Sequence, residues 1–303
     1  MKSVSVSTDH VIVTLFGGLG NQLFQYAAGL TIARETGAEL LVHEKSDVGF
    51  TDFLDIAVKP LDQVVLRRSA LVAPEQRSLV RRVTWQVHSE FNRLSGTSAM
   101  YRQRFAFDSR TSSPPLPTSK YLGLHGYFQH PSWFESPFGL LIQSLGVRVD
   151  QKSSPIVHDR LNDIGEFTIV SFRRGDYLRW GAELPLEYYQ RAISVLPRSG
   201  GPLFIISDDE LVSKFSEFWF AERGFEVLPQ THFGDRGRIR DLALLSRATQ
   251  VVMANSTFCW WGTVLGDVRA TAAGTTRHVV APKQWLKEPL GGEVLVRPEW
   301  IAI

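Results

Sequence analysis

Short apolar runs alternate with helical patterns at the start of the chain. Residues 11–16 form a continuous apolar run, which is typical of a strand buried on both faces of a parallel sheet. Residues 21–34 carry apolar positions three and four residues apart, and Gly37 follows, so a helix that ends at this glycine is predicted. Residues 39–44 predict the next strand. This order is typical of a doubly wound α/β domain.

The pattern weakens in the middle of the chain. Residues 92–120 are rich in Ser, Thr, Pro and Arg, so they predict an irregular excursion from the first domain. A strand over 119–128 and helical spacing over 131–145 then restore the alternation.

Strands and helices alternate again in the second half. The predicted strands are 167–172, 202–209, 226–230, 250–255 and 278–285, and the predicted helices are 185–196 and 239–248. The alternation predicts an α/β protein of two facing Rossmann-like domains, residues 1–154 and 155–303, with a ligand cleft between them. Ligands of such sheets bind at the carboxyl ends of the strands.

Composition narrows the class of protein. The 303 residues have a net charge of +2, which gives no electrostatic footprint for general nucleic-acid binding. Cys259 is the only cysteine, so disulfides and cysteine-based zinc sites are excluded, and a cytoplasmic protein is expected. No apolar run reaches the roughly 18 residues of a membrane span, and the first ten residues do not read as a signal peptide. The sequence does not indicate an oligomeric state.

Arginine is concentrated in one segment. Between residues 66 and 105 the basic residues are Arg67, Arg68, Arg77, Arg81, Arg82, Arg93, Arg102 and Arg104, against only Glu75 and Glu90. The segment is either an ordinary solvated surface or a patch for an anionic partner. The second alternative leaves open a peripheral contact with the inner membrane surface or with a lipid-linked glycan.

Four stretches of unusual composition each follow a predicted strand. They are GGLGNQ (17–22), RRGDY (173–177), SDDE (207–210) and NSTFCWWG (255–262). Because ligands bind at the carboxyl ends of parallel strands, this coincidence supports a ligand site at these ends.

The glycine-rich stretch is not a nucleotide-binding fingerprint of the common kinds. With Gly18 and Gly20 as its first glycines, a dinucleotide motif would need a third where Leu23 stands, and no Gly-Lys-Ser/Thr follows for a P-loop. The glycines allow close approach of the backbone to an anion, or simply serve the turn. Asn21 and Gln22 are polar amides that open an otherwise apolar helix.

Two motifs of the second half carry charge. Arg173 and Arg174 can neutralise a diphosphate, while Asp176 can hold an arginine or accept a proton. Asp208 and Glu210 are spaced to hold Mg²⁺ or Mn²⁺. In the competing interpretation one acid of this motif binds a base or ribose and the other caps the next helix.

The fourth motif combines hydroxyls with the start of a helix. Ser256 and Thr257 stand where a strand is followed by a helix, which favours an anion site. Cys259 is interpreted as a small buried apolar residue rather than a nucleophile, since no base partner is evident. Trp260 and Trp261 are expected in the core or in a cleft wall.

Taken in order, six pieces of the chain resemble glycosyltransferase family 11, the α-1,2-fucosyltransferases. They are GGLGNQLFQYAAGLTIA, GYFQHPSWF, FRRGDYL, SDD, DLALLSRATQVVMANSTFCWWGTVLG and APKQW, within residues 11–285. The resemblance implies a GT-B-like fold and inverting transfer of L-fucose from GDP-β-L-fucose to a galactoside 2-hydroxyl. It implies no cofactor and no metal.

The resemblance also implies roles for individual residues. The donor would lie in the C-terminal domain and the acceptor on the side of the N-terminal domain. The implied donor contacts are Gly18, Gly20, Asn21, Gln22, Arg173, Arg174, Asp208 or Asp209, Asn255, Ser256 and Thr257, with Arg173 on the diphosphate. For the proton of the acceptor hydroxyl, Asp176 is the first candidate and Glu183 the second.

One departure leaves alternatives open. The family motif usually reads His-x-Arg-Arg-Gly-Asp, and Ser171 stands in the place of the histidine. The alternatives are a transferase of this fold with another nucleotide sugar, a metal-dependent transferase, and a non-catalytic sugar-binding protein. A dinucleotide oxidoreductase is disfavoured because Leu23 breaks the glycine fingerprint.

Overall fold

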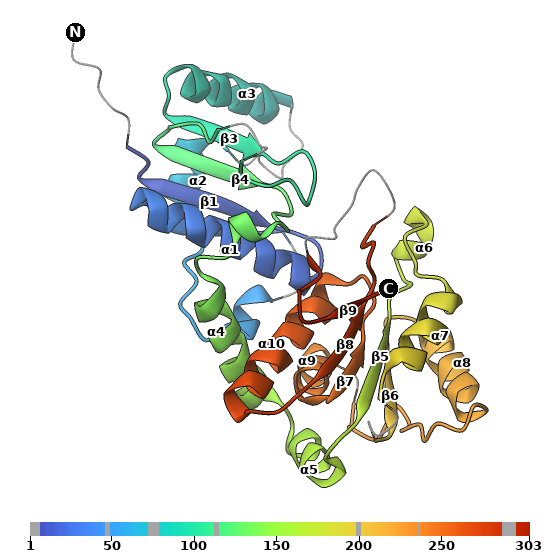
Figure 1. The fold of residues 1–303 in the computed structure, drawn as a ribbon. Coiled ribbons are helices and arrows are strands. Elements are labelled where there is room, and N and C mark those ends of the chain that lie inside the picture. Colours follow the sequence, from blue (N-terminus) through green and yellow to red (C-terminus); the bar gives the residue numbers. More distant parts are fainter. Residues whose placement is uncertain are drawn as a thin grey trace. The chain divides into compact units, whose positions relative to one another are not determined.

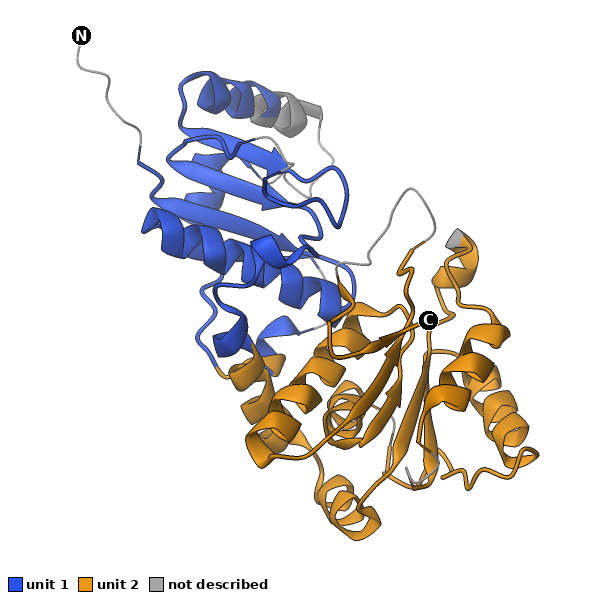
Figure 2. Cartoon of the chain, viewed as in Figure 1, with its two compact units in different colours: residues 1–52, 56–141 blue, residues 53–55, 142–303 orange. Residues whose placement is uncertain are grey.

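A computed structural model shows two compact units (Figure 2). Unit 1 comprises residues 1–52 and 56–141, and unit 2 comprises residues 53–55 and 142–303. The structure describes residues 7–45, 49–71, 79–111, 115–197, 201–235, 237–286 and 295–303, without the side chains of residues 79–85 and Trp180.

Unit 1 is an α/β unit with a parallel sheet of strand order β2-β1-β4-β3 (Figure 1). Its elements up to residue 133 are β1 (His10–Leu15), α1 (Leu19–Thr36), β2 (Glu39–Glu44), η1 (Phe50–Phe53), α2 (Gln63–Ser69), α3 (Leu79–Leu94), β3 (Ser98–Arg102), β4 (Tyr121–His125) and η2 (Pro131–Trp133).

The first strand and helix form where the sequence predicts them. α1 ends at Gly37, whose φ of 68° is the left-handed conformation that glycine adopts without strain. A Cβ at Gly29 would lie 2.8 Å from Leu40 Cδ1 and 3.1 Å from Val13 Cβ. The missing side chain therefore lets α1 pack closely on β1 and β2.

Strand β3 corrects the prediction that residues 92–120 are wholly irregular. Ser98–Arg102 pairs in parallel with β4, and Ser98 lies opposite Tyr121. Within β3 only Ser98 and Tyr101 are fully buried. The segment therefore has a weak apolar signal of its own, and its pairing with β4 stabilises it as a strand.

Unit 2 contains a second parallel sheet of order β6-β5-β7-β8-β9. Its elements are α4 (Phe138–Lys152, in unit 2 from Ile142), α5 (Pro155–Ile164), β5 (Thr168–Phe172), α6 (Tyr177–Trp180), α7 (Leu186–Val195), β6 (Leu203–Ser207), α8 (Glu210–Ala221), α9 (Arg238–Arg247), β7 (Gln250–Val252), α10 (Thr257–Ala273), β8 (His278–Ala281) and β9 (Ile301–Ala302). The two parallel sheets with their helices confirm the predicted α/β class.

The division between the units lies upstream of residue 154 because α4 packs on α10. A Cβ at Gly146 would lie 3.1 Å from Leu265 Cδ1. Arg269 of α10 donates to the Gly146 carbonyl at 3.3 Å and to Asp150 Oδ1 at 2.7 Å. These contacts join most of α4 to unit 2.

Residues 226–230 do not form the predicted strand. Val227 makes only an isolated bridge with Leu203. The Ile205 carbonyl, which is the next acceptor on β6, binds the side-chain amide of Gln230 at 2.7 Å instead of a backbone N–H group, and the pairing stops after one bridge.

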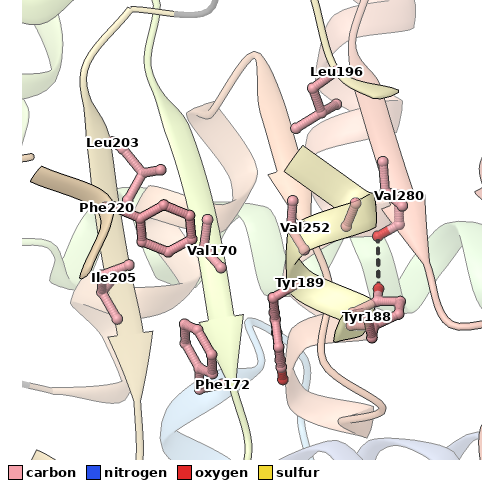
Figure 3. Close-up of a cluster of buried hydrophobic side chains, with 11 residues drawn as sticks. Val170, Phe172, Tyr188, Tyr189, Leu196, Leu203, Ile205, Phe220, Val252 and Val280 are labelled. Carbon is pink, nitrogen blue, oxygen red and sulfur yellow. Dashed lines mark hydrogen bonds between the residues drawn. The ribbon is translucent and has the colours of Figure 1, made fainter. Parts of the chain in front are cut away.

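The helix α7 is fixed on the sheet of unit 2 by two tyrosines (Figure 3). The ring of Tyr189 stacks on Phe172 of β5 with centroids 4.0 Å apart. The buried hydroxyl of Tyr188 donates to the Met253 carbonyl at 2.7 Å and lies 3.4 Å from the Val280 carbonyl. This packing holds α7 against the sheet close to the carboxyl ends of β5 and β7.

Candidate functional site

Three of the four polar motifs meet at one edge of the unit 2 sheet. Strand β5 pairs in parallel with β6 on one side and with β7 on the other, so all three carboxyl ends lie at the same edge. Residues 173–176 follow β5, residues 208–210 follow β6, and residues 255–257 stand between β7 and α10. The fourth motif, residues 17–22, follows β1 in unit 1.

Arg173 is held by two carboxylates. Its Nη2 lies 2.6 Å from Asp176 Oδ1 and its Nη1 lies 2.7 Å from Asp208 Oδ2. The guanidinium carbon also lies 5.2 Å from the ring centroid of Tyr177. A guanidinium has five N–H donors, so donors remain for a ligand after both carboxylates are bound.

Asp208 organises the turn after β5. Its Oδ1 accepts the backbone N–H of Arg174 at 2.9 Å, while its Oδ2 binds Arg173. A Cβ on Gly175 would lie 2.6 Å from Asp208 Oδ2. Glycine at position 175 therefore allows the carboxylate to approach the turn.

Arg174 is bound differently from Arg173. Its Nε is buried and makes no hydrogen bond, and Asp209 Oδ2 lies 3.9 Å away. A buried guanidinium N–H without a partner costs free energy that an incoming acceptor would recover. The second arginine of the motif is therefore suited to bind an anion.

Asp209 and Glu210, the acids that follow Asp208, each bind a different partner. Asp209 caps α8, because its Oδ1 accepts from Leu211 N at 3.0 Å and from Val212 N at 3.2 Å, as the capping interpretation predicted. Glu210 binds Lys214 at 3.0 Å on the surface of α8. Across the part of the chain that the structure describes, no group of three or more His, Cys, Asp or Glu is placed to hold a metal ion.

Asn255 ties three segments together through the nitrogen of its side-chain amide. Its Nδ2 donates to the carbonyls of Ala182 at 2.8 Å and of Trp285 at 2.9 Å. Its backbone carbonyl accepts a hydrogen bond from the hydroxyl of Tyr177 at 2.8 Å, whereas the side-chain oxygen Oδ1 is buried and has no hydrogen-bond partner. Since both amide hydrogens are used within the protein, a phosphate contact through this amide would require these bonds to break.

The start of α10 provides a helix N-terminus at the same edge. Ser256 is the capping residue, and its hydroxyl accepts from Cys259 N at 3.4 Å. Thr257 is the first residue of this 17-residue helix, and both hydroxyl residues are half-buried. The helix dipole gives this end a partial positive charge.

Glu183 has a buried carboxylate oxygen without a hydrogen-bond partner. Oε2 of this half-buried residue is fully buried and has no hydrogen-bond partner. Its neighbour Ala182 is held by Asn255. Asp176, by contrast, uses Oδ1 to bind Arg173.

Ser171, in the place of the family histidine, is buried on β5. It contacts the thiol of Cys259, which is fully buried in α10. Burial raises the pKa of the Cys259 thiol, and the hydroxyls of Ser171 and Thr263 offset part of this effect. A buried neutral thiol is a poor nucleophile, which agrees with the structural interpretation of this cysteine.

The glycine turn of unit 1 is organised by its own amides. Gly17 has a φ of 75°, so it is the residue of the turn that needs to be glycine on conformational grounds. Gln22 is buried and its Nε2 donates to the Gly17 carbonyl at 2.8 Å, whereas Asn21 Oδ1 accepts from Gln129 at 2.9 Å. Contact of Gly18, Gly20, Asn21 or Gln22 with a donor substrate stays a prediction.

An aromatic group at the carboxyl edge of unit 1 was missed in the sequence analysis. Phe16 after β1 stacks on His125 of β4 with centroids 5.0 Å apart, and Tyr127 meets Phe16 at 5.1 Å. All three are half-buried. Burial, and then the charges of Arg102 and Lys45, lower the pKa of His125. The position of these residues at the carboxyl ends of two predicted strands was the available signal.

Comparisons with known proteins agree with the resemblance seen in the sequence. A family model described as glycosyl transferase family 11 matches residues 98–303, which is more than half of the chain. The match includes the motifs of unit 2 and excludes residues 17–22.

Two relatives from Escherichia coli extend over nearly the whole chain. The O-antigen biosynthesis glycosyltransferase WbnK is 24% identical over 295 residues, or 89% of this chain and 93% of WbnK. An alpha-1,2-colitosyltransferase is 22% identical over 314 residues, or 97% of this chain and 98% of that protein. A glycosyl transferase family 9 crystal structure from Veillonella parvula DSM 2008 shares the fold at 8% identity, with a TM-score of 0.50 and coverage of 97% and 86%.

Proposed function

The chain belongs to glycosyl transferase family 11, and from this membership we propose that it transfers L-fucose from GDP-β-L-fucose to the 2-hydroxyl of a terminal galactoside. The proposed reaction is a single displacement that inverts the anomeric carbon. We place it in the cytoplasm and in surface glycan synthesis, because the relative WbnK is named for O-antigen biosynthesis. The sections of the chain that the structure describes include no helix long and apolar enough to cross a membrane.

The proposal rests on Arg173 and Arg174, which stand near the start of α10. Arg173 is bound by two carboxylates, whereas Nε of Arg174 makes no hydrogen bond. As the bond to the sugar breaks, negative charge grows on the departing diphosphate. Arg173, Arg174 and the helix end at Ser256 and Thr257 are the groups that would meet this charge. Each preorganised donor of this kind contributes about 2.7–4 kcal/mol to transition-state stabilisation.

We assign the proton of the acceptor hydroxyl to Glu183. The acceptor oxygen forms its bond to the anomeric carbon while the carbon–oxygen bond to the diphosphate breaks, and its proton passes to a carboxylate. Glu183 Oε2 has no competing partner, whereas Asp176 already binds Arg173. This reverses the order of the two candidates that the sequence suggested.

We propose that the reaction needs neither a metal ion nor another cofactor. Asp208 and Glu210, the acids of the metal alternative, bind Arg173 and Lys214 respectively. In this proposal the arginines, and not a metal ion, neutralise the charge of the diphosphate. Asp208 and Asn255 act as positioning residues for the turn after β5 and for the loop that contains Glu183.

The aromatic group of unit 1 fits the side of the acceptor. Sugar rings present apolar C–H faces that pack on aromatic rings, and Phe16 and Tyr127 are half-buried at the carboxyl edge of their sheet. We expect Phe16→Ala to raise the KM for the acceptor by roughly tenfold, with little change in the KM for the donor. A larger change in the donor KM would contradict this assignment.

The alternative is a transferase of the same fold with another nucleotide sugar. It is favoured by the relative named as a colitosyltransferase and by Ser171 in the place of the motif histidine. A donor panel separates the possibilities. Purified protein is incubated with GDP-fucose, a colitosyl nucleotide, GDP-mannose, UDP-galactose or UDP-glucose, with lactose and Galβ1,3GalNAc as acceptors and EDTA in excess.

Transfer from GDP-fucose alone, in EDTA, supports both the donor and the metal independence. Transfer from the colitosyl nucleotide instead would overturn the donor assignment and retain the reaction type. Activity that appears only after metal is added would overturn metal independence. Binding of sugars without transfer from any donor would favour the non-catalytic alternative.

A further inference from the structure

Helix α3 exposes an apolar stripe at the edge of unit 1. Val87, Phe91 and Leu94 are 65%, 67% and 72% exposed and stand at i, i+4 and i+7, so they share one face of the helix. Figure 1 shows α3 beside β3, the last strand of its sheet. A row of exposed apolar side chains on one helix face is a candidate contact surface.

The opposite face of α3 fixes the direction of the stripe. Asn92 is buried, and its amide donates to the carbonyls of Arg68 at 2.7 Å and Ser69 at 3.3 Å. Successive helical residues are rotated by about 100°, so Phe91 lies about 100° and Leu94 about 160° around the helix from Asn92. The stripe therefore lies on a face of α3 that does not pack on α2, and the face that Asn92 holds against α2 lies to one side of the stripe.

The surface next to the stripe is basic. Arg67 and Arg68 of α2, His88 of α3 and Lys120 line an open depression of about 460 Å³ together with Thr97 and Tyr121. No acidic residue is among these lining residues. Two of the acids on this side are paired, since Asp9 lies 3.5 Å from Lys120 and Glu90 binds Arg93 on α3. Arg77 and the side chains of Arg81 and Arg82 lie outside what the structure describes.

A second exposed apolar stripe provides the contrast. Leu211, Phe215 and Phe218 of α8 are 79%, 58% and 64% exposed, but acidic Glu210 and Glu217 share their helix. The area of exposed apolar surface is therefore not what sets α3 apart. The distinguishing property is the cluster of cations beside it.

We propose that α3 docks on a membrane surface that contains anionic lipids. The apolar stripe enters the boundary between head groups and acyl chains, as amphipathic surface helices do, and the cations of α2 and Lys120 bind the lipid phosphates. The argument uses only surface chemistry, so it does not depend on the donor or acceptor proposed above.

Vesicle flotation tests the proposal. The full chain is mixed with vesicles of phosphatidylcholine alone or with about 30 mol% phosphatidylglycerol. We expect binding to the anionic vesicles, weaker binding to the neutral ones, and loss of binding as salt is raised to about 0.5 M. Equal binding to both vesicle types, or none to either, would overturn the proposal.

Two variants and a matched control locate the surface. Phe91→Ser with Leu94→Ser, and separately Arg67→Glu with Arg68→Glu, are each expected to weaken binding on the order of tenfold or more. Leu211→Ser with Phe215→Ser removes a comparable apolar surface on α8 and is expected to leave binding unchanged. Turnover of a water-soluble acceptor and the thermal midpoint should be retained in all three variants.

Light scattering without vesicles tests whether a second copy of the chain, and not a membrane, covers the stripe. If the wild-type chain is a dimer and Phe91→Ser with Leu94→Ser makes it a monomer, a second copy covers the stripe and the membrane proposal is wrong. An α8 variant that loses vesicle binding as strongly as the α3 variant would also overturn it.

Discussion

The carboxylate of Asp208 binds the side chain of Arg173 with one oxygen and the backbone N–H group of Arg174 with the other. The distances are 2.7 Å to the Arg173 guanidinium and 2.9 Å to Arg174 N. One side chain from the end of β6 thus sets both the direction of an arginine and the path of the turn after β5.

Asp208→Asn is expected to lower kcat/KM by about 100-fold, because a shift of the arginines by an ångström is enough to misplace the donor. Gly175→Ala should have a similar effect, since the new Cβ would lie 2.6 Å from the carboxylate. Steady-state kinetics with saturating acceptor measures both. Glu210→Gln is the control and should retain wild-type activity, with or without EDTA; a loss as large as that of Asp208→Asn would instead support the metal alternative.

Arg173→Ala and Arg174→Ala are each expected to reduce kcat by roughly 10²–10³-fold, because each removes a donor that meets the charge of the departing diphosphate. The exposed Arg179 of α6 provides a matched control, and Arg179→Ala should leave kcat within about twofold. Thermal unfolding should show that all three variants fold. Near-normal kcat in Arg173→Ala would refute the assignment of this arginine to the diphosphate.

Glu183→Gln is expected to lower kcat by about 10²–10⁴-fold while donor binding is retained, because the amide cannot accept the proton of the acceptor hydroxyl. Asp176→Asn should have a smaller effect on kcat, since Asp176 mainly holds Arg173. Calorimetric titration with GDP and single-turnover kinetics separate binding from chemistry. A larger kcat loss in Asp176→Asn than in Glu183→Gln would restore Asp176 as the proton acceptor.

His125 is expected to make folding sensitive to pH. Burial, and then Arg102 and Lys45, lower its pKa in the folded protein, so the unfolded chain binds a proton that the folded chain resists. The contribution of His125 to the free energy of unfolding is complete above about pH 6.5, which is the ordinary pKa of histidine. It declines as the pH falls from there toward the lowered pKa of the folded protein. Below the folded pKa no further loss arises from this group.

Urea unfolding at pH values above and below this window measures the effect. His125→Gln should lose less free energy of unfolding on acidification than the wild type. His130 and His232, whose pKa values are also lowered by burial, remain in both proteins and cancel in the comparison. Equal losses in the two proteins would show that His125 is not responsible.

The sequence predicted that the polar motifs of unit 2 lie at one edge of the sheet, because this placement depends only on the order and direction of the strands. Parallel strands with apolar runs place their following residues at one edge, so Arg173, Asp208 and Ser256 could be grouped before any contact was known. The same rule, applied to β1 and β4, would have found Phe16 and His125. The edge strand β3 was missed because its stability comes from its neighbour.

The partners of the polar side chains could not be predicted in the same way. Asn255 donates to carbonyls 73 and 30 residues away in the sequence, and Gln22 donates to the turn that it follows. The sequence alone does not show whether a side-chain amide at the end of a strand binds the backbone or a ligand. Only the packed structure shows which bonds are already made.

The two carboxylates on Arg173 have a consequence for how the proposed site would distinguish anions by their charge. The positive charge of this arginine is matched by Asp176 and Asp208 of the chain itself, so a monovalent anion that replaces Asp176 exchanges one single charge for another. A diphosphate brings charge to Arg173 and Arg174 together and can leave Asp208 in its place. We therefore expect chloride and simple carboxylates to be poor competitors of the proposed diphosphate, and we expect the second phosphate to be the group that distinguishes a nucleoside diphosphate from a monophosphate.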